Sequence, residues 1–557
     1  MNIQLNKCAA LLASFLATNL AAAEPARHGM VATVHPLATE AGLNVLRSGG
    51  NAVDAAVAVG LTLGVVDVDN SGIGGGCFML IRRADGSLVA LDGRETAPAA
   101  ATRDMFIRNG KVDPHLSQTG ALASGVPGAL EAYDFAVAHF GKKKLKDLLL
   151  PAAELAEKGF VLPKGYASRL KEEAEEMRKF PASTAIFFKN DQPLVLGEKL
   201  KQPELAATYR VIAGQGSDWF YAGPFARATE KWMKANGGIM TARDFGDYRI
   251  RDREPLVSTY RGFKLVTFPP PSSGGVHVAE ILNILENFEL KSMPEVQRLH
   301  VVAEAMKMAF ADRAYWLGDP DFAPVPRGLV DKSYASELAR KINSEHAVEV
   351  SSHGTPPGWQ TNIFKKHTTH FSVADSEGNW VACTATVNTS FGSKVVIPGT
   401  GVIMNNEMDD FSAQPGAANY FGLIGAEANA IAPGKRPLSS MSPTIVLKDD
   451  KPVIALGAAG GPKIISAVVM ELVDMLDLGM TPQEALTAPR IHHQWSPDEL
   501  LVESTLPREV QQGLEKRGHK VKAASGLALS QIVAFDPVTQ IFIGAADPRA
   551  GGLAEGW

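Results

Sequence analysis

Two neighbouring threonines stand where a single chain cut would create a nucleophile together with its own base. Thr368 follows His367, and residues 371–375 and 380–387 are rich in strand-forming residues, with Glu377-Gly378-Asn379 between them. This pattern predicts a β-hairpin with Thr368 at the head of its first strand. A threonine hydroxyl needs an adjacent base, and the α-amine of an N-terminal threonine can serve because its pKa is about 7.7–8.0.

In the intact chain the Thr368 hydroxyl could attack the carbonyl of His367, form an ester and release the α-amine when that ester is hydrolysed. The precursor would then cut itself. Threonine pairs at strand starts are also common in hairpins without any catalytic group, so these residues alone equally permit two stacked surface threonines.

Motifs along the whole chain favour the catalytic interpretation. From residue 367 onward they read HTTHFSVADSEGN, TVNTSFG, NNEMDDFSA, KRPLSSMSPT, GAAGGPKII and APRIHHQWSPDEL, and the first half contains GIGGGCFML, GRETAP, SGVPGAL and PPPSSGG. In this order they resemble the γ-glutamyltransferase (γ-glutamyltranspeptidase) family. Any one of these motifs would be weak alone, whereas the ordered series is very specific.

The resemblance implies an α+β fold, the N-terminal-nucleophile αββα sandwich, in which two stacked sheets lie between helical layers. A large segment, 24–367, and a small segment, 368–557, would form it jointly as one intertwined unit. The implied reaction transfers the γ-glutamyl group of glutathione or a related amide, through an ester on Thr368, to water, amino acids or peptides. No cofactor is implied.

The resemblance also assigns the residues that bind the amino-acid head of the γ-glutamyl group. Its α-carboxylate would be held by Arg94, Ser439 and Ser440, and its α-ammonium by Asn388, Glu407 and Asp410. A planar guanidinium suits the first role because it grips a carboxylate through two hydrogen bonds. Judged by spacing alone, Arg94 is a surface arginine paired with Glu95, and the two serines are turn residues.

Residues 405–411 contain several carboxylates that would repel one another unless a cation were present, so we expect them either to be solvated or to surround a positive ligand group. Many relatives have Gln at the position of Glu407, so its acidity could alter affinity. The implied lid covers 412–424, with Tyr420 beside the gate residue Phe421, which lacks a hydroxyl.

Three further residues are implied in the chemistry itself. Thr386 would hydrogen-bond near Thr368 and steady it. Gly460 and Gly461 would point two backbone N–H groups at the oxyanion, a contact whose loss can cost about 2.7–4 kcal/mol. The same two glycines also suit a tight strand-to-helix turn.

Local patterns predict the elements that must position these residues. The predicted helices cover 37–48, 52–63 with Asn51 as its cap, 296–316 as an amphipathic helix, and 463–478, with outer helices across 130–250. The predicted strands pair 77–82 with 87–92 and 444–447 with 452–459. Residues 344–366 have loop composition, which suits a region cut just before Thr368.

Composition indicates a globular protein, and the first residues indicate that it is exported. It has 557 residues, 45% hydrophobic and 21% charged, and its formal net charge of −5 implies no general attraction to nucleic acid. Residues 1–23 read as a signal peptide, and no later run is long enough to anchor the chain in a membrane. We therefore expect a periplasmic or secreted protein in which Cys77 and Cys383 are buried free thiols.

Other chemistries fit less well. The glycines at 72–76 precede a strand rather than a helix, so they indicate close backbone packing and not a nucleotide loop. His367, His370, His492 and His493 lack metal-ligand spacing, and no GxSxG elbow occurs. Two alternatives stay open: a related glutaryl or cephalosporin acylase, and an inactive secreted protein that binds γ-glutamyl compounds.

Overall fold

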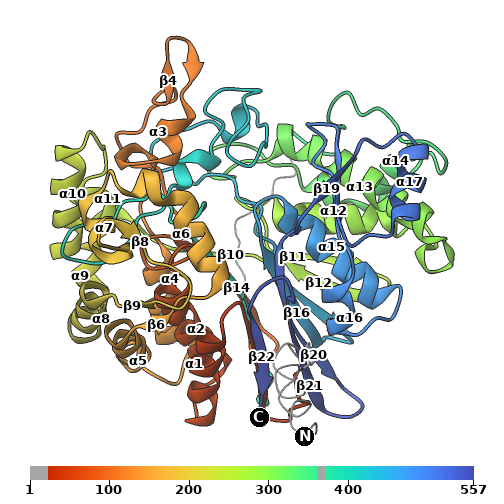
Figure 1. Cartoon of the computed structure of the whole chain (residues 1–557). Coiled ribbons are helices and arrows are strands. Elements are labelled where there is room, and N and C mark those ends of the chain that lie inside the picture. The colour runs from red at the N-terminus through yellow and green to blue at the C-terminus, as the bar shows by residue number, and fades with distance from the viewer. Residues whose placement is uncertain (1–22, 361–370) are drawn as a thin grey trace, which may run out of the picture.

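Two large antiparallel sheets face each other at the centre of the molecule (Figure 1). The computed structural model describes residues 23–360 and 371–557, so the His367–Thr368 bond and nearly all of the expected signal peptide lie outside the described residues. In order across the seven-stranded sheet lie β10 (Arg251–Arg253), β3 (Leu88–Gly93), β2 (Gly76–Arg82), β14 (Trp380–Thr386), β13 (Ser372–Asp375), β1 (Gly29–Thr33) and β22 (Leu553–Gly556). Across the six-stranded sheet lie β11 (Leu256–Tyr260), β12 (Phe263–Thr267), β15 (Thr444–Lys448), β16 (Lys451–Ala459), β20 (Leu529–Asp536) and β21 (Ile541–Ala546).

Helices cover the outer face of each sheet. The seven-stranded sheet is covered by α2 (Ala52–Val66) and α4 (Ala129–Phe140), with α1 (Pro36–Arg47) beside them. The six-stranded sheet is covered by α12 (Gly274–Leu285), α15 (Lys463–Leu476) and α16 (Pro482–Thr487), and α13 (Glu295–Trp316) packs on α12 (Figure 1). This helix–sheet–sheet–helix order confirms the predicted αββα sandwich.

Strands from both sides of position 367 alternate within the sheets. In the seven-stranded sheet β13 and β14 lie between β1 and β2, and in the six-stranded sheet β12 pairs with β15. Neither side of position 367 could therefore complete a sheet by itself.

The remaining elements surround this sandwich. The peripheral helices are α3 (Pro114–Gln118), α5 (Leu145–Lys158), α6 (Lys164–Met177), α7 (Pro181–Phe187), α8 (Pro203–Gln215), α9 (Asp218–Tyr221), α10 (Pro224–Ala235), α11 (Ala242–Asp247), α14 (Lys332–Ala339) and α17 (Arg508–Lys516). Most of those in 130–250 were expected as outer helices. The small strands are β4 (Ile107–Arg108), β5 (Lys111–Val112), β6 (Phe160–Val161), β7 (Phe188–Lys189), β8 (Gln192–Pro193), β9 (Lys199–Leu200), β17 (Ile491–His492), β18 (Leu500–Glu503) and β19 (Val521–Ala524).

Local predictions near the site are confirmed. Asn51 caps α2 by accepting hydrogen bonds from the N–H groups of Val53 and Asp54. The predicted hairpin is present, with Ser372 opposite Ala382 in β13 and β14. The glycine run packs backbone against backbone, since a Cβ on Gly75 would lie 1.9 Å from the carbonyl oxygen of Thr386.

The predicted helix at 296–316 is present as α13 (Glu295–Trp316), but the prediction that it is amphipathic is wrong. Helix α13 is buried from Leu299 to Arg313, and its charged residues lie inside the protein with polar partners. Lys307, for example, donates to the carboxylate of Glu304 at 2.8 Å and to the carbonyl of Val348 at 2.9 Å. The charges at helical spacing had suggested a polar face toward solvent, but their partners lie within α13 and in segments packed against it.

Cys77 and Cys383 are both buried and unbridged, as expected. Within residues 23–360 and 371–557, no helix combines the length and apolar character that crossing a bilayer requires.

Candidate functional site

One cavity of about 230 Å³ brings together every predicted site residue that the structure describes. It lies where β3, β14 and β16 end at the same edge of the two sheets. Eleven of its lining residues were predicted: Arg94, Thr386, Asn388, Glu407, Asp410, Tyr420, Phe421, Ser439, Ser440, Gly460 and Gly461. Thr368 and His367 lie outside the described residues.

Two hydrogen bonds hold the backbone of Arg94 in place. It follows the last residue of β3, where its N–H donates to the carboxylate of Asp92 at 2.7 Å and its carbonyl accepts from the Tyr248 hydroxyl at 2.8 Å. Asp92 is itself held by Arg253 and Arg436, each 3.0 Å away. The guanidinium therefore enters the cavity wall from a rigid support, with only 1% of its side chain exposed.

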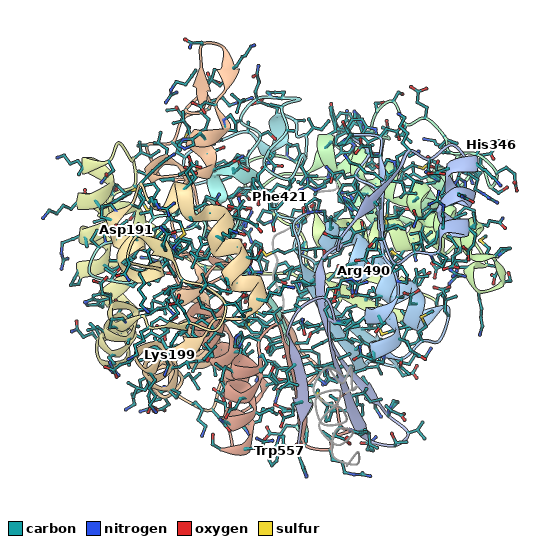
Figure 2. All side chains as sticks on the ribbon, in the orientation of Figure 1. Asp191, Lys199, His346, Phe421, Arg490 and Trp557 are labelled. Atoms are coloured by element: carbon teal, nitrogen blue, oxygen red, sulfur yellow. The ribbon has the colours of Figure 1, made fainter. Side chains whose placement is uncertain are left out.

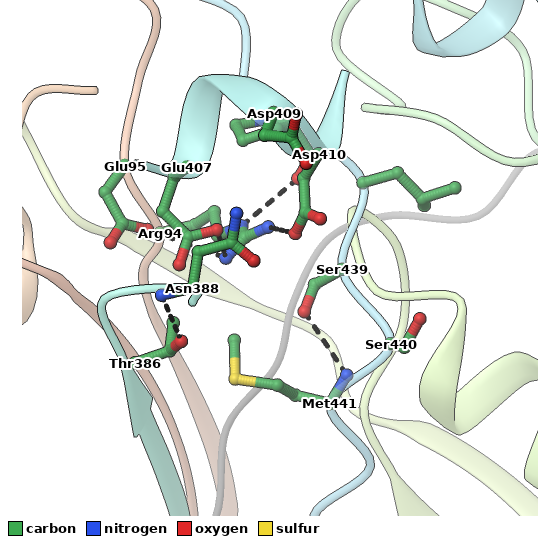
Figure 3. A network of polar contacts seen from close by, with 12 residues as sticks. Arg94, Glu95, Thr386, Asn388, Glu407, Asp409, Asp410, Ser439, Ser440 and Met441 are labelled. Carbon is green, nitrogen blue, oxygen red and sulfur yellow. Dashed lines mark hydrogen bonds and ion pairs between the residues drawn. The ribbon is translucent and has the colours of Figure 1, made fainter. Parts of the chain in front are cut away.

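The Arg94 guanidinium is surrounded by three carboxyl groups (Figure 3). Glu407 and Asp410 each lie 2.6 Å from one of its terminal nitrogens, and Glu95 lies 3.7 Å away. The acids are therefore not solvated, and in the described state Arg94 supplies the cation that keeps them together. Spacing did suggest an Arg94–Glu95 pair, although on the surface rather than in the interior.

Burial shapes the protonation of this cluster. Burial would lower the pKa of Arg94, but Glu407, Asp410 and Glu95 raise it above its usual value, so the guanidinium stays charged. Burial raises the pKa of Glu95 to about 8, although Arg94 opposes the shift. Burial also raises the pKa of Glu407, again against Arg94. Because Arg94 is much nearer to Glu407, we infer that Glu95 holds a proton at neutral pH.

The two predicted serines lie across the cavity from the acids (Figure 3). The Ser439 hydroxyl oxygen accepts a hydrogen bond from the Met441 N–H at 3.2 Å. The Ser440 hydroxyl oxygen accepts from the guanidinium of Arg313 at 3.0 Å. Arg313 was not predicted as a site residue, because it stands in 296–316, whose pattern predicted an amphipathic helix with its charged side chains toward solvent.

Thr386 and Asn388 form a small bonded unit at the end of β14. The Thr386 hydroxyl oxygen accepts from the Asn388 N–H at 2.7 Å, and the Asn388 amide donates to the carbonyl of Asn406 at 3.0 Å. Asn388 has a φ of 78°, a left-handed conformation that asparagine tolerates better than most residues. This turn directs the chain from the strand along the cavity wall.

Gly460 and Gly461 form the turn between β16 and α15. Their φ angles are 143° and 61°, so the tight-turn interpretation holds. In the described part of the chain, neither N–H has a hydrogen-bond acceptor, although both residues line the cavity. Two consecutive free donors at a cavity wall are the arrangement that an oxyanion requires.

The predicted lid lies on this glycine pair. A Cβ on Gly461 would be 2.6 Å from the Phe421 ring, so the ring packs directly on the glycine backbone. Phe421 is seen where the two halves of the molecule meet (Figure 2). The Gln494 side chain donates to the carbonyls of Phe421 and Gly422, and the Tyr420 N–H donates to Asp409 at 2.9 Å. The contacts of Gln494 and Asp409 with the lid were not predicted, although both residues stand inside the family motifs.

Outside this cavity, His300, Glu304 and His519 are the one group of metal-ligand types that the described residues bring close together. The ring nitrogens of His300 and His519 are 2.7 Å apart and share a hydrogen bond. The Lys307 ammonium donates to Glu304 at 2.8 Å. These contacts occupy the atoms that would ligate a metal.

Fold and site together define the class of protein. An αββα sandwich with a polar cavity where the strands of both sheets end, lined by paired N–H donors and by buried charged and hydroxyl side chains, is that of an N-terminal-nucleophile hydrolase. The sequence profile of the γ-glutamyltranspeptidase family matches residues 38–557. The chain belongs to the γ-glutamyltranspeptidase family.

Individual relatives agree with this assignment. The glutathione hydrolase proenzyme of Escherichia coli (strain K12) is 44% identical over 530 residues, which are 94% of this chain and 91% of the relative. A crystal structure of cephalosporin acylase from Bacillus halodurans has a TM-score of 0.87 at 31% identity and covers 96% of this chain and 97% of its own. A crystal structure of Helicobacter pylori γ-glutamyltranspeptidase has a TM-score of 0.57 at 40% identity, covering 61% of this chain and 97% of its own.

Proposed function

We propose that this chain is a precursor that cuts itself between His367 and Thr368 and then transfers γ-glutamyl groups from glutathione or related amides to water, amino acids or peptides. The supporting observation is the convergence of the predicted site residues on one cavity. They come from segments on both sides of position 367, which a cleaved but intertwined protein would keep together.

The hairpin register supports the assignment of the nucleophile. Ser372 pairs with Ala382 and Val373 with Val381. The partner strand β14 ends at Thr386, which lines the cavity. Thr368 lies outside the described residues, four positions before the start of β13 in the sequence.

In the proposed reaction the Thr368 hydroxyl attacks the γ-carbonyl of the substrate and gives its proton to its own α-amine. The oxyanion accepts hydrogen bonds from the N–H groups of Gly460 and Gly461. The amine then passes the proton to the leaving nitrogen, the amide bond breaks, and a γ-glutamyl ester remains on Thr368. Water or an acceptor amine then attacks the ester carbonyl and loses a proton to the α-amine. The ester bond breaks, and the α-amine passes this proton to the departing Thr368 oxygen, which restores the hydroxyl.

The cavity also suits the head of the substrate. Hydroxyl groups of Ser439 and Ser440 can donate to its α-carboxylate, while Glu407 and Asp410 lie where an α-ammonium would be attracted. A plain acyl chain would leave these buried polar groups unpaired, and such a mismatch costs more than a missing methylene. We therefore favour γ-glutamyl over simple acyl substrates.

Amino-terminal sequencing of the purified fragments tests the nucleophile. Wild type should give two bands on a denaturing gel, and the smaller fragment should begin at Thr368. Thr368→Ala should remain one band without turnover, because it lacks the hydroxyl for both cleavage and catalysis. The matched control, Thr369→Ala, should still cut. Recovery of an uncut but fully active wild-type chain would contradict the proposal.

Two alternatives have separate signatures. The first alternative is an acylase for glutaryl or cephalosporin side chains, which lack the α-ammonium, and the structural similarity to a cephalosporin acylase is the observation behind it. Such an enzyme would turn over a glutaryl anilide at least as well as a γ-glutamyl anilide. An inactive binding protein would stay as one uncut chain.

We further propose that residues 1–23 direct export, so that the mature protein works in the periplasm or medium. Fractionation of cells that express the full chain tests this, and a mature protein confined to the cytoplasm would contradict it.

A further inference from the structure

Arg313 is a second buried guanidinium at the cavity, and its bonding differs from that of Arg94. It projects from the last turn of α13 and is 5% exposed. Its Nε donates to the Ser273 hydroxyl at 2.8 Å and its Nη2 donates to the Ser440 hydroxyl at 3.0 Å. Among the described residues it has no carboxylate partner within ion-pair distance.

This bonding determines where the Ser440 proton can point. A serine hydroxyl has one donor proton and two acceptor lone pairs, whereas a guanidinium only donates. Since Arg313 donates to Ser440, the Ser440 proton must be directed elsewhere. No acceptor for it is present in the part of the chain that the structure describes, and Ser440 lines the cavity. The hydroxyl is therefore oriented to donate to a bound group.

Ser273 fixes the second serine of the pair. Its hydroxyl accepts from Arg313 and donates to the carbonyl of Ser439 at 2.7 Å, and its N–H donates to the same carbonyl at 2.8 Å. The Ser439 hydroxyl oxygen already accepts from the Met441 N–H. Both serines are thus left with their protons available, which suits a carboxylate and opposes an ammonium.

Charge points in the same direction. The two acids in contact with Arg94 compensate its charge, so Arg94 alone leaves little positive potential for an anionic ligand. Arg313 supplies a second buried charge directly behind Ser440, and no carboxylate of the described residues lies within ion-pair distance of it. Burial lowers the pKa of Arg313 to about 10, against the opposing effect of the Asp410 charge, which still leaves Arg313 charged at neutral pH.

We propose that Arg313 is a positioning residue that turns the Ser440 hydroxyl toward the substrate's α-carboxylate and provides the positive charge for that subsite. This inference rests on the proposed function and deepens it. It differs from a structural role, in which Arg313 would only tie α13 to the segment around Ser440.

Three anilides separate these roles. γ-Glutamyl anilide carries both head charges, glutaryl anilide lacks the ammonium, and 4-aminobutanoyl anilide lacks the carboxylate. Arg313→Gln should lower kcat/KM for the two carboxylate-bearing anilides by roughly 10- to 100-fold, mainly through KM. Turnover of 4-aminobutanoyl anilide should be unchanged. An equal loss on all three substrates would overturn the proposal in favour of a structural role.

A second measurement checks that Arg313 acts through Ser440. In a Ser440→Ala background, adding Arg313→Gln should change the discrimination between γ-glutamyl and 4-aminobutanoyl anilides by less than about twofold. A further large loss would show that Arg313 acts without Ser440. If Arg313→Gln fails to fold, Ser273→Ala replaces it as the test variant, since it removes the acceptor of Arg313 Nε. It should likewise lower kcat/KM for γ-glutamyl anilide relative to 4-aminobutanoyl anilide.

Matched controls complete the design. Arg298→Gln makes the same change on the same helix. Within the described residues the Arg298 side chain donates to the Met293 carbonyl at 3.4 Å and its charge acts on Asp474, away from the cavity, so this variant should leave all three rates unaltered. Arg313→Lys keeps the charge but cannot span both serines, so its effect should be intermediate. If wild type turns over none of the anilides, the proposed function fails; if wild type is active and Arg313→Gln keeps full discrimination, only the present inference fails.

Discussion

Glu95→Gln probes the electrostatics of the cavity most directly. Glu95 is fully buried, and neither of its carboxyl oxygens has a hydrogen-bond partner among the described residues. Its nearest cation is Arg94 at 3.7 Å, while two other acids contact Arg94 at 2.6 Å. Glutamine has nearly the same shape as a protonated glutamic acid but cannot ionise. The variant therefore isolates the proton that we assign to Glu95.

The magnitude follows from the pKa of Glu95, which burial raises from 4.5 to about 8. Between these two values the unfolded chain releases the proton and the folded chain keeps it, so the unfolded state binds fewer protons and wild-type stability falls as pH rises. Each pH unit is worth about 1.4 kcal/mol. Over the full interval wild type should lose roughly 5 kcal/mol relative to Glu95→Gln, with no further divergence above the folded pKa.

Urea unfolding from about pH 5 to about pH 9 measures this difference. Both proteins should carry Thr368→Ala, so that one uncut chain is compared with another. The free energies of unfolding should be similar near pH 5 and diverge in favour of Glu95→Gln up to about pH 8. Parallel curves would refute the assignment of a proton to Glu95.

A control carboxyl lies away from the cavity. Glu471 in α15 pairs with Arg490, and burial raises its pKa to about 7. The free energy of unfolding of Glu471→Gln should also rise above that of wild type as pH increases, and the difference should stop growing near pH 7 rather than pH 8. In the cleaved enzyme it should leave the KM of γ-glutamyl anilide unchanged, whereas Glu95→Gln should change how that KM varies with pH. This comparison separates a general effect of a buried acid from an effect on the site.

The remaining predictions concern backbone geometry. Gly461→Ala places a Cβ 2.6 Å from the Phe421 ring at a φ of 61°, so kcat/KM for γ-glutamyl anilide should fall roughly 10- to 100-fold as the N–H donors and the lid shift. Gly479→Ala, at a φ of 76° with no atom within 4 Å of its Cβ, is the matched control and should leave these kinetics unaltered. Asn51→Ala removes the cap of α2 and should lower the free energy of unfolding by about 1 kcal/mol without changing kcat/KM; an unchanged urea midpoint would contradict this.

Elements whose signals are local could be predicted from the sequence. The Asn51 cap, the hairpin of β13 and β14, and the strand-to-helix turn at Gly460-Gly461 each depend on a few neighbouring residues. Helix α12 was not predicted. It is buried on all sides, so it lacks the polar stripe that marks an amphipathic helix, and it begins inside a Pro- and Gly-rich stretch typical of a loop.

Contacts between residues far apart in the sequence could not be predicted from local patterns. The sequence showed that the carboxylates of Glu407 and Asp410 would repel each other without a cation. It did not show that this cation is Arg94, more than 300 residues earlier in the chain. The charges of α13 likewise looked solvated until Asp312 met the Tyr334 hydroxyl and Arg313 met two serines. The family resemblance identified which residues share the site, whereas only the structure assigned hydrogen bonds to them.

These bonds give the cavity two chemically opposite sides. On one side, the carboxyl groups of Glu407 and Asp410 contact Arg94 and line the cavity, where their oxygens can accept hydrogen bonds from an ammonium. On the other side, Arg313 has no carboxylate of the described residues within ion-pair distance, and it stands behind a serine whose proton has no acceptor among them. A ligand with both charges on one carbon can satisfy both sides at once. A ligand with either charge alone leaves one buried side unpaired, so selectivity for a zwitterionic head follows from how the acids are divided between the two arginines.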